Sequence, residues 1–307
     1  MINNDLFYCK NKDTYPPFKN GFYKEEYFLM KYLKDKPKTY RIYIPALWTN
    51  FQIEGWFNHK IYEMQQSLDE WIKNNPSEEG YFTIVQYDDG CLLKLPENTL
   101  IYGSCSGSIP IPLIYEDTNS TLEKLPKKRF NEKEILCSFV GNITGNHLFP
   151  NVRKLIIEMF KDNSNFKLIY DTNWSPIVNK NKQDDFIKTS INSKFGLAPR
   201  GYGRNSFRFF ELFKLGTIPI YVWNDIDWLP FKDEIDYSRL CININYNELK
   251  DLETILLNIN EEKYNNMLKY YETIKHLFTV EGLYEKILDY DKHIIMENDK
   301  ILIYKKN

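Results

Sequence analysis

The sequence predicts an α/β protein built from two lobes that face a cleft. Short apolar runs of strand character alternate with amphipathic helical stretches in the first hundred residues, and the alternation starts again near residue 135. Between these regions, residues 117–133 form a polar stretch with Pro126 and the basic run Lys127-Lys128-Arg129, which is typical of a linker. Each alternating region is therefore predicted to be a Rossmann-like lobe.

The first lobe is expected to span residues 1–130. Its clearest helix is 59–73, where apolar residues recur at helical spacing. The expected strands are 40–44, 81–86, 99–102 and 109–114. Pro110 and Pro112 mark the last of these as an edge strand or an extended loop.

The second lobe is expected to span residues 131–275. Its expected strands are 135–140, 166–170, 195–198 and 217–222, and its expected helices are 150–161, 184–189, 248–258 and 261–278. A helical tail, 276–307, is expected to pack back on the first lobe, with its helix beginning near Val280.

The stretch 194–222 is the most informative part of the chain. An apolar strand enters a loop with Pro199, Gly201 and Gly203, Asn205 or Ser206 can cap the following helix, and a second strand comes after it. A glycine-bearing loop that leads into a helix N-terminus is a good anion site, because free backbone N–H groups and the helix dipole point at the ligand.

The same stretch carries a family resemblance. The patterns Gly-Leu-x-Pro-Arg-Gly (196–201), Ser-x-Arg-x-x-Glu (206–211) and Leu-Gly-x-Ile-Pro-Ile (215–220) resemble the C-terminal signature of exostosin-type glycosyltransferases. Leu-Pro-Phe at 229–231, Asp-Tyr-Ser at 236–238 and the strand around Cys137 resemble further elements of that family. The resemblance covers about residues 136–257. It implies the GT-B architecture, in which two Rossmann-like lobes face a cleft, and which the alternation predicts independently.

A glycosyltransferase must hold a nucleotide diphosphate and stabilise it as it leaves. Arg200, Arg204 and Arg208 are the candidate cations, since a guanidinium can grip phosphate oxygens in two places. Glu211 lies on the same helix face as Arg208 and is expected to accept hydrogen bonds from the ribose hydroxyls; the alternative is an ion pair within the helix. The remaining candidates for the nucleotide-sugar site are Gly201, Asn205, Ser206, Asn142 and Arg153.

An inverting transfer also needs one base that faces the acceptor. Asp88 and Asp89 follow an apolar strand, at the carboxyl end where ligands gather in such sheets. Asp-Asp-Gly is equally typical of an ordinary turn. Glu54, within an aromatic segment that could form an acceptor-binding loop, is the alternative base.

Metal chemistry has little support in the sequence. The four histidines show no ligand spacing, and no Cys-x-x-Cys pair is present. Asp225-Ile226-Asp227 matches the short Asp-x-Asp motif that holds a divalent cation in glycosyltransferases of the GT-A fold, but three residues are a weak match. We interpret this segment as a loop and expect neither metal nor other cofactor.

Composition narrows the setting. The net charge of -2 argues against a nucleic-acid binder, and five scattered cysteines favour free thiols in a reducing compartment. No apolar run reaches the roughly 18 residues that span a bilayer, and no signal peptide opens the chain. We expect a cytoplasmic protein, peripheral to a membrane-bound glycan assembly.

These observations predict an inverting, metal-independent glycosyltransferase that moves a sugar from a UDP-sugar to a hydroxyl of a glycan, in surface polysaccharide or glycoprotein glycan synthesis. Two alternatives stay open. One is a GDP-sugar enzyme similar to a fucosyltransferase, and the other is an inactive relative that binds glycans.

Overall fold

The computed structural model describes residues 1–10, 15–144, 150–297 and 300–303, and it divides the chain into two units. Unit 1 comprises residues 1–12, 22–116 and 277–307, and unit 2 comprises residues 13–21 and 117–276. The division differs from the expected boundaries in two ways. Unit 2 begins at residue 117 and so includes the segment predicted as a linker, and residues 13–21 also belong to it.

Unit 2 is built on one parallel sheet, as the alternation of strands and helices predicts. The strands are β5 (Ile135–Asn142), β6 (Phe166–Asp171), β7 (Ser193–Pro199), β8 (Ile218–Trp223) and β9 (Ile242–Asn245). Their order in the sheet is β6-β5-β7-β8-β9, and every neighbouring pair is parallel. This is a doubly wound order, in which the chain first builds outward from β5 and then returns to its other side.

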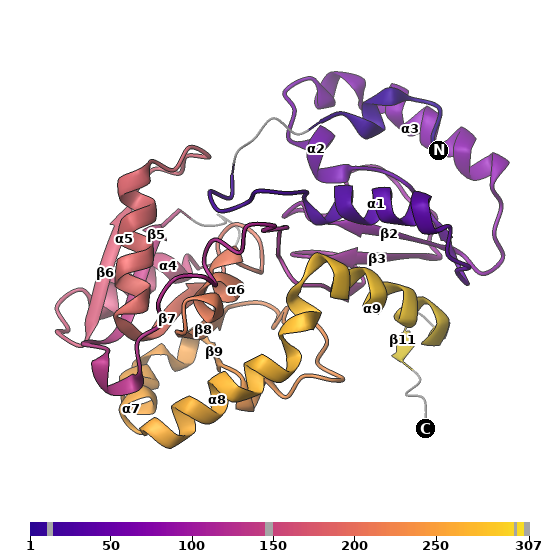
Figure 1. Cartoon of the computed structure of the whole chain (residues 1–307). Helices are drawn as coiled ribbons and strands as arrows, with labels where there is room; N and C mark the ends of the chain where they lie inside the picture. The colour runs from indigo at the N-terminus through magenta and orange to yellow at the C-terminus, as the bar shows by residue number, and fades with distance from the viewer. Residues whose placement is uncertain (11–14, 145–149, 298–299, 304–307) are drawn as a thin grey trace. The chain divides into compact units, whose positions relative to one another are not determined.

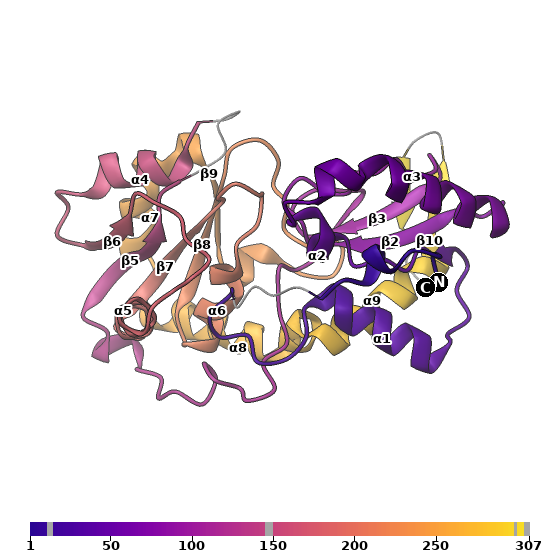
Figure 2. The ribbon, with the colours of Figure 1, turned by 90° about the horizontal axis from the view of Figure 1, so that it is seen from above.

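Helices cover both faces of this sheet. Figure 2 shows α4 and α7 on one face and α5 and α6 on the other. The helices of unit 2 are α4 (Val152–Phe160), α5 (Lys180–Ile191), α6 (Phe207–Lys214), α7 (Leu252–Leu257) and α8 (Glu261–Ile274). Short 3-10 helices are η2 (Phe130–Glu132), η3 (Tyr237–Arg239), η4 (Tyr246–Asp251) and, across the unit boundary, η5 (Lys275–Phe278).

The contact between α6 and β7 fixes the position of the signature helix. Gly196 on β7 lies against Leu212 of α6, where an added Cβ would stand 2.5 Å from the leucine methyl group. Phe209 packs edge-on against Tyr221 of β8, and Phe213 stacks on Tyr271 of α8 with ring centroids 4.4 Å apart. Glycine at 196 therefore lets the helix approach the sheet closely, and buried aromatic rings hold it there.

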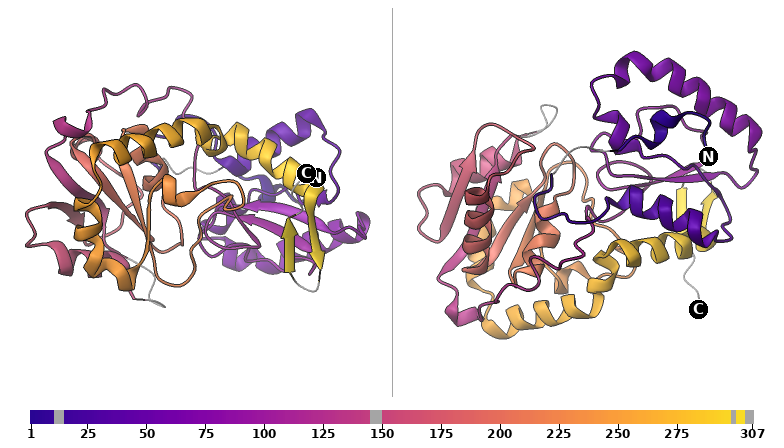
Figure 3. Two further views of the ribbon diagram at one scale, coloured as in Figure 1. Left: turned by 90° about the horizontal axis from the view of Figure 1, so that it is seen from below. Right: turned by 45° about the horizontal axis from the view of Figure 1, so that its top comes forward.

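Unit 1 has a smaller parallel sheet. Its strands are β1 (Ile42–Tyr43), β2 (Tyr81–Val85), β3 (Thr99–Gly103) and β4 (Ile109–Pro110), in the order β1-β2-β3-β4. The helices of unit 1 are η1 (Asp5–Tyr8), α1 (Lys24–Asp35), α2 (Trp48–Gln52), α3 (Phe57–Asn74) and α9 (Val280–His293). Figure 1 labels these helices, and Figure 2 and the right-hand view of Figure 3 show α3 on one side of this sheet and α1 with α9 on the other.

The two faces of β2 explain this layering. Tyr81 and Val85 belong to the apolar cluster that contains Met64 and Leu68 of α3. Phe82, which points to the opposite face, packs against Phe28 of α1. β2 is buried along its whole length, as expected for a central strand of a parallel sheet covered on both faces.

The tail and the edge strand correct two expectations. The tail is not helical throughout, because α9 is followed by the antiparallel strands β10 (Ile294–Glu297) and β11 (Lys300–Ile303). The predicted strand 109–114 pairs only over Ile109–Pro110, because a proline cannot donate to the ladder. The tail joins unit 1 through Arg41, whose guanidinium donates to the Ile294 carbonyl at 2.8 Å and lies 3.5 Å from the Asp291 carboxylate.

Candidate nucleotide site

A cavity of about 300 Å³ lies in unit 2 at the carboxyl ends of β5 and β6 and beside the start of α6. This is the point where the strand order reverses, because β5 lies between β6 and β7 in the sheet. Crevices at such switch points are where open α/β sheets bind ligands. All the residues that line the cavity belong to unit 2.

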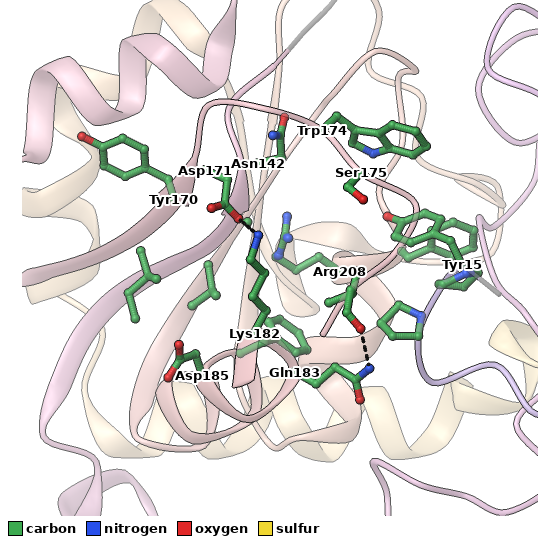
Figure 4. Close-up of a pocket in the computed structure, with 18 of the residues that line it drawn as sticks. Tyr15, Asn142, Tyr170, Asp171, Trp174, Ser175, Lys182, Gln183, Asp185 and Arg208 are labelled. Atoms are coloured by element: carbon green, nitrogen blue, oxygen red, sulfur yellow. Dashed lines mark hydrogen bonds and ion pairs between the residues drawn. The ribbon is translucent and has the colours of Figure 1, made fainter. Parts of the chain in front are cut away.

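Arg208, in the first turn of α6, points into the cavity (Figure 4). Its guanidinium carbon lies 5.1 Å from the centre of the Phe139 ring and 5.8 Å from that of Phe186. Its Nε is buried and has no hydrogen-bond partner in the described part of the chain. Burial lowers the pKa of Arg208, while the charges of Glu211 and Tyr15 act in the opposite direction. The result is a half-buried cation with unused hydrogen-bonding capacity.

The backbone of β5 makes room for this cation. A Cβ at Gly141 would collide with the Arg208 guanidinium, so a glycine at this position lets the arginine lie against the strand end. The neighbouring Asn142 also lines the cavity, and its buried Nδ2 has no partner among the described residues. Two donor groups from different elements are therefore available at one edge of the sheet.

Arg153, on α4, joins the ends of two strands. It donates from Nη1 to the Asn142 carbonyl at 2.7 Å and from Nε to the Arg200 carbonyl at 3.2 Å. An added Cβ at Gly201 would stand 2.5 Å from the Arg153 guanidinium. Arg153 lines the cavity, and its bonds to these two main-chain carbonyls position the walls of the site.

The start of α6 places two further predicted residues on the cavity. Ser206 is the N-cap residue, but its side chain makes no capping hydrogen bond. Glu211, one turn into the helix, is buried and lines the same cavity as Arg208. Asn205 is buried next to them and accepts a hydrogen bond from the Ser206 N–H at 2.8 Å, but it does not line the cavity.

The structure does not bring Arg200 and Arg204 to the cavity. Both guanidinium groups contact the Asp225 carboxylate instead, Arg204 at 2.8 Å. Arg200 also donates to Asn224 Oδ1 at 2.8 Å, and Arg204 lies over the Trp228 ring. These contacts with Asp225 explain why two arginines predicted for phosphate face another part of the unit.

Asp225 is thus engaged by cations of the protein. Burial raises its pKa, but the Ile226 N–H, the hydrogen bond from Arg204 and the charge of Arg200 outweigh this effect and hold the pKa below its ordinary value. Asp227 pairs with Lys232 at 2.9 Å. Across the described residues, three or more His, Cys, Asp or Glu side chains nowhere gather in a way that could hold a metal ion.

The candidate bases lie in unit 1, at the carboxyl edge of its sheet. Asp88 and Asp89 occupy a turn after β2, closed by a hydrogen bond from the Gly90 N–H to the Tyr87 carbonyl. Gly90 has φ of 81°, a conformation that favours glycine. Asp88 is half-buried and Asp89 is exposed.

Gln52 ties the segment of the alternative base to this turn. Its amide donates to the Gly90 carbonyl at 2.9 Å and accepts from the Leu92 N–H at 2.7 Å. Glu54, two residues later, is half-buried between α2 and α3. The two segments predicted to carry the base are therefore neighbours in the folded unit.

Sequence reasoning missed a third acid at the same edge. Glu25 is fully buried and accepts hydrogen bonds from the Thr49 N–H at 2.9 Å, the Thr49 hydroxyl at 2.7 Å and the Gln86 N–H at 2.6 Å. Burial raises its pKa to about 7, although these bonds and the charge of Lys24 oppose the shift. No sequence signal marks Glu25, which lies in the first turn of α1, ahead of the unit's first strand in the sequence.

It also missed one wall of the cavity in unit 2. Asp171 and Lys182 form an ion pair of 2.7 Å there, and Trp174 and Tyr15 line another side of the same cavity (Figure 4). The rule that placed Asn142 at a strand end would have found Asp171, the last residue of β6, had it been applied to that strand. Nothing in the sequence connects Tyr15 with this site.

The chain matches the family model described as the Exostosin GT47 domain over residues 103–259, which is 157 of its 307 residues. It is 23% identical to the Exostosin-1 homolog of Caenorhabditis elegans over 227 residues, 64% of this chain and 59% of that protein. It is 26% identical over 155 residues to a protein of Arabidopsis thaliana named "Probable glycosyltransferase", covering 48% of this chain and 32% of that protein.

The chain thus spans less than two thirds of the length of these relatives. Among solved structures, an α1,3-fucosyltransferase aligns over 81% of this chain and 83% of its own, with 14% identity and a TM-score of 0.26. No helix in the described residues is long and apolar enough to cross a membrane.

Proposed function

The chain belongs to the exostosin GT47 family, and from this premise we propose that it is a glycosyltransferase that moves a sugar from a UDP-sugar to a hydroxyl of a glycan with inversion. A base takes the proton of the acceptor hydroxyl, and the oxygen attacks the anomeric carbon on the face opposite UDP. The bond from that carbon to the phosphate oxygen breaks, and UDP leaves with the electron pair.

One observation carries the donor side of this proposal. Arg208 and Glu211 line one cavity at the strand-order reversal of a parallel sheet, and the Arg208 Nε and Asn142 Nδ2 have no protein partner among the described residues. A half-buried cation with unused donors is stabilised by an anionic ligand, because the alternative is an unsatisfied charge. Arg208 would neutralise the departing diphosphate, and Glu211 would accept hydrogen bonds from the ribose.

On the acceptor side we propose Asp88 as the base, with Asp89 and Glu54 as alternatives. Asp88 is half-buried, whereas Asp89 is exposed. A partly buried carboxylate at a strand end can be directed at one proton, which a base in an inverting transfer requires.

We propose that the transfer does not depend on a divalent metal. The support is the arrangement around the Asp-x-Asp segment, where Arg200 and Arg204 hold Asp225 and Lys232 holds Asp227. A carboxylate neutralised by two guanidinium groups is a poor metal ligand, since the cations must first be displaced. Arg208 supplies the positive charge instead.

A nucleotide titration tests the donor site. UDP and GDP are titrated by calorimetry into the full chain and into Arg208→Ala, with Arg204→Ala, in the loop that leads into α6, as the matched control. Loss of a charge-assisted hydrogen bond is worth roughly 1.5–3 kcal/mol, so Arg208→Ala should weaken UDP binding about tenfold to a hundredfold.

Arg204→Ala should leave the affinity for UDP nearly unchanged, because its guanidinium faces Asp225. Thermal melting checks that each variant is folded, and Arg208→Lys, which keeps the charge, should recover part of the affinity. Equal UDP affinities for wild type and a folded Arg208→Ala would overturn the assignment of Arg208 to the donor site. Tighter binding of GDP than of UDP would show that the donor is a GDP-sugar.

A further inference from the structure

The cavity in unit 2 is closed on one side by a segment from far upstream. Residues 15–18 line it, although the next segment of unit 2 begins only at residue 117. These residues also lie outside the stretch that matches the exostosin family model, residues 103–259. We name residues 15–20 the strap.

The strap is fixed to unit 2 by specific contacts. Phe18 packs on Phe186 of α5 with ring centroids 6.0 Å apart. The Asn20 amide oxygen accepts hydrogen bonds from the Thr118 hydroxyl at 2.9 Å and the Asn119 N–H at 3.0 Å. Because Phe18 and Asn20 are anchored in the same unit as the cavity, the strap is part of the wall.

The strap brings an aromatic ring to the cavity. Tyr15 packs edge-on against Trp174 and against Phe207, with ring centroids 6.0 Å apart in both pairs. Trp174 is 57% exposed and Ile177, also on the cavity wall, is 77% exposed. Exposed aromatic and apolar side chains beside a cavity are available to a flat ligand.

The cavity therefore has two chemically different ends. Figure 4 shows Tyr15 and Trp174 gathered on one side, away from Asn142 and the Asp171–Lys182 pair. Arg208 lines the same cavity and adds a cation to it. A nucleoside diphosphate has the complementary division, since a flat aromatic base is joined through ribose to an anion.

We propose that Tyr15 and Trp174 bind the nucleobase of the donor by stacking, and that the strap thereby makes the N-terminal segment part of the donor site. This inference rests on the proposed function. Stacking on aromatic side chains holds bases without a requirement for charge. The strap is a binding element and takes no part in bond breaking.

The test separates the two ends of the cavity. UDP and inorganic pyrophosphate are titrated into the full chain carrying Tyr15→Ala, Tyr15→Phe or Arg208→Ala. Tyr15→Ala should weaken UDP roughly tenfold, the effect of losing one stacked ring. It should leave pyrophosphate, which has no base, within about twofold of wild type. Arg208→Ala should weaken both ligands, and Tyr15→Phe should bind UDP like wild type.

A second readout reports on Trp174 directly. UDP should quench tryptophan fluorescence in wild type and should lose most of this quenching in Trp174→Phe. Tyr62→Ala, on an 85% exposed tyrosine of α3 in unit 1, is the control and should bind UDP like wild type.

The outcomes distinguish the strap from the site. If Arg208→Ala loses UDP and Tyr15→Ala keeps it, the strap proposal fails and the donor site stands. Equal losses of UDP and pyrophosphate in Tyr15→Ala would show that the strap does not act on the base, which also overturns the proposal. If Arg208→Ala retains UDP, the proposed donor site itself is wrong.

Discussion

The carboxyl edges of the two parallel sheets handle buried charge in opposite ways. In unit 1, both oxygens of the buried Glu25 carboxylate are occupied by Thr49 and Gln86. In unit 2, Arg208 reaches a cavity with its Nε unpaired among the described residues. The carboxyl edge of each of these two parallel sheets is a suitable place for a ligand. The difference between them is whether the charged group is already satisfied by its own unit.

The largest expected effect is a loss of turnover on replacing Asp88. It would show that the carboxyl edge of the unit 1 sheet takes part in catalysis, although the Glu25 carboxylate at that edge is already hydrogen-bonded within the unit. Asp88→Asn should lower turnover by about a hundredfold to ten-thousandfold, the usual contribution of a general base, and should leave UDP affinity unchanged. Single-turnover rates with calorimetry on the same samples measure both quantities. Asp89→Asn is the matched control in the same turn. Near-normal turnover in both variants would leave the turn with a structural role and make Glu54 the residue to test.

The next effect concerns stability and sharpens the contrast with Arg208. Glu25→Ala leaves buried donors of Thr49 and Gln86 unsatisfied and should lower the free energy of unfolding by roughly 3 kcal/mol at pH 5. Chemical denaturation measures it. Arg208→Ala, which empties a site instead of orphaning partners, should cost much less.

The pH dependence of that loss has a definite sign. Burial raises the pKa of Glu25 to about 7 in the folded state, above its ordinary value of 4.5. The stability that Glu25 contributes is therefore complete below pH 4.5 and declines as pH rises through 7. The difference between wild type and Glu25→Ala should be smaller at pH 8 than at pH 5. A difference that grows with pH would contradict a raised pKa.

The smallest expected effect is none. EDTA should leave transfer activity intact, because Arg208 and the start of α6 are proposed to supply the charge that a metal would otherwise provide. Activity is assayed before and after chelation, with manganese added back. A loss that manganese restores would reverse the argument and make Asp225 and Asp227 candidate ligands.

The sheets were predictable because their residues are locally consistent. Apolar runs of strand length, glycines and a helical period at 206–215 favour the same elements that α6, β7 and β8 form. The short strands β1 and β4 were overestimated in length, since pairing partners decide where a ladder stops. The helix α1 and the hairpin of β10 and β11 were not predicted.

Residues of the candidate site could be predicted only where a general rule connects a sequence pattern with a position in the fold. The strand-end rule led to Asn142, and the signature helix led to Arg208 and Glu211, all of which line the cavity. The same signature led to Arg200 and Arg204, because charge alone does not say which partner a guanidinium meets. Tyr15 lies more than a hundred residues upstream of β5, and only the folded chain brings it to the cavity.

The chain passes between the units four times, at 12/13, 21/22, 116/117 and 276/277. As the polypeptide leaves the ribosome, unit 2 is complete at residue 276, while Arg41 of unit 1 still lacks Asp291, which follows 250 residues after it. Chains generally fold as their domains emerge. Unit 1, which contains the start of the sequence, is therefore completed after unit 2. A chain that stopped at residue 276 would retain all of unit 2 but would leave unit 1 without residues 277–307 and Arg41 without Asp291.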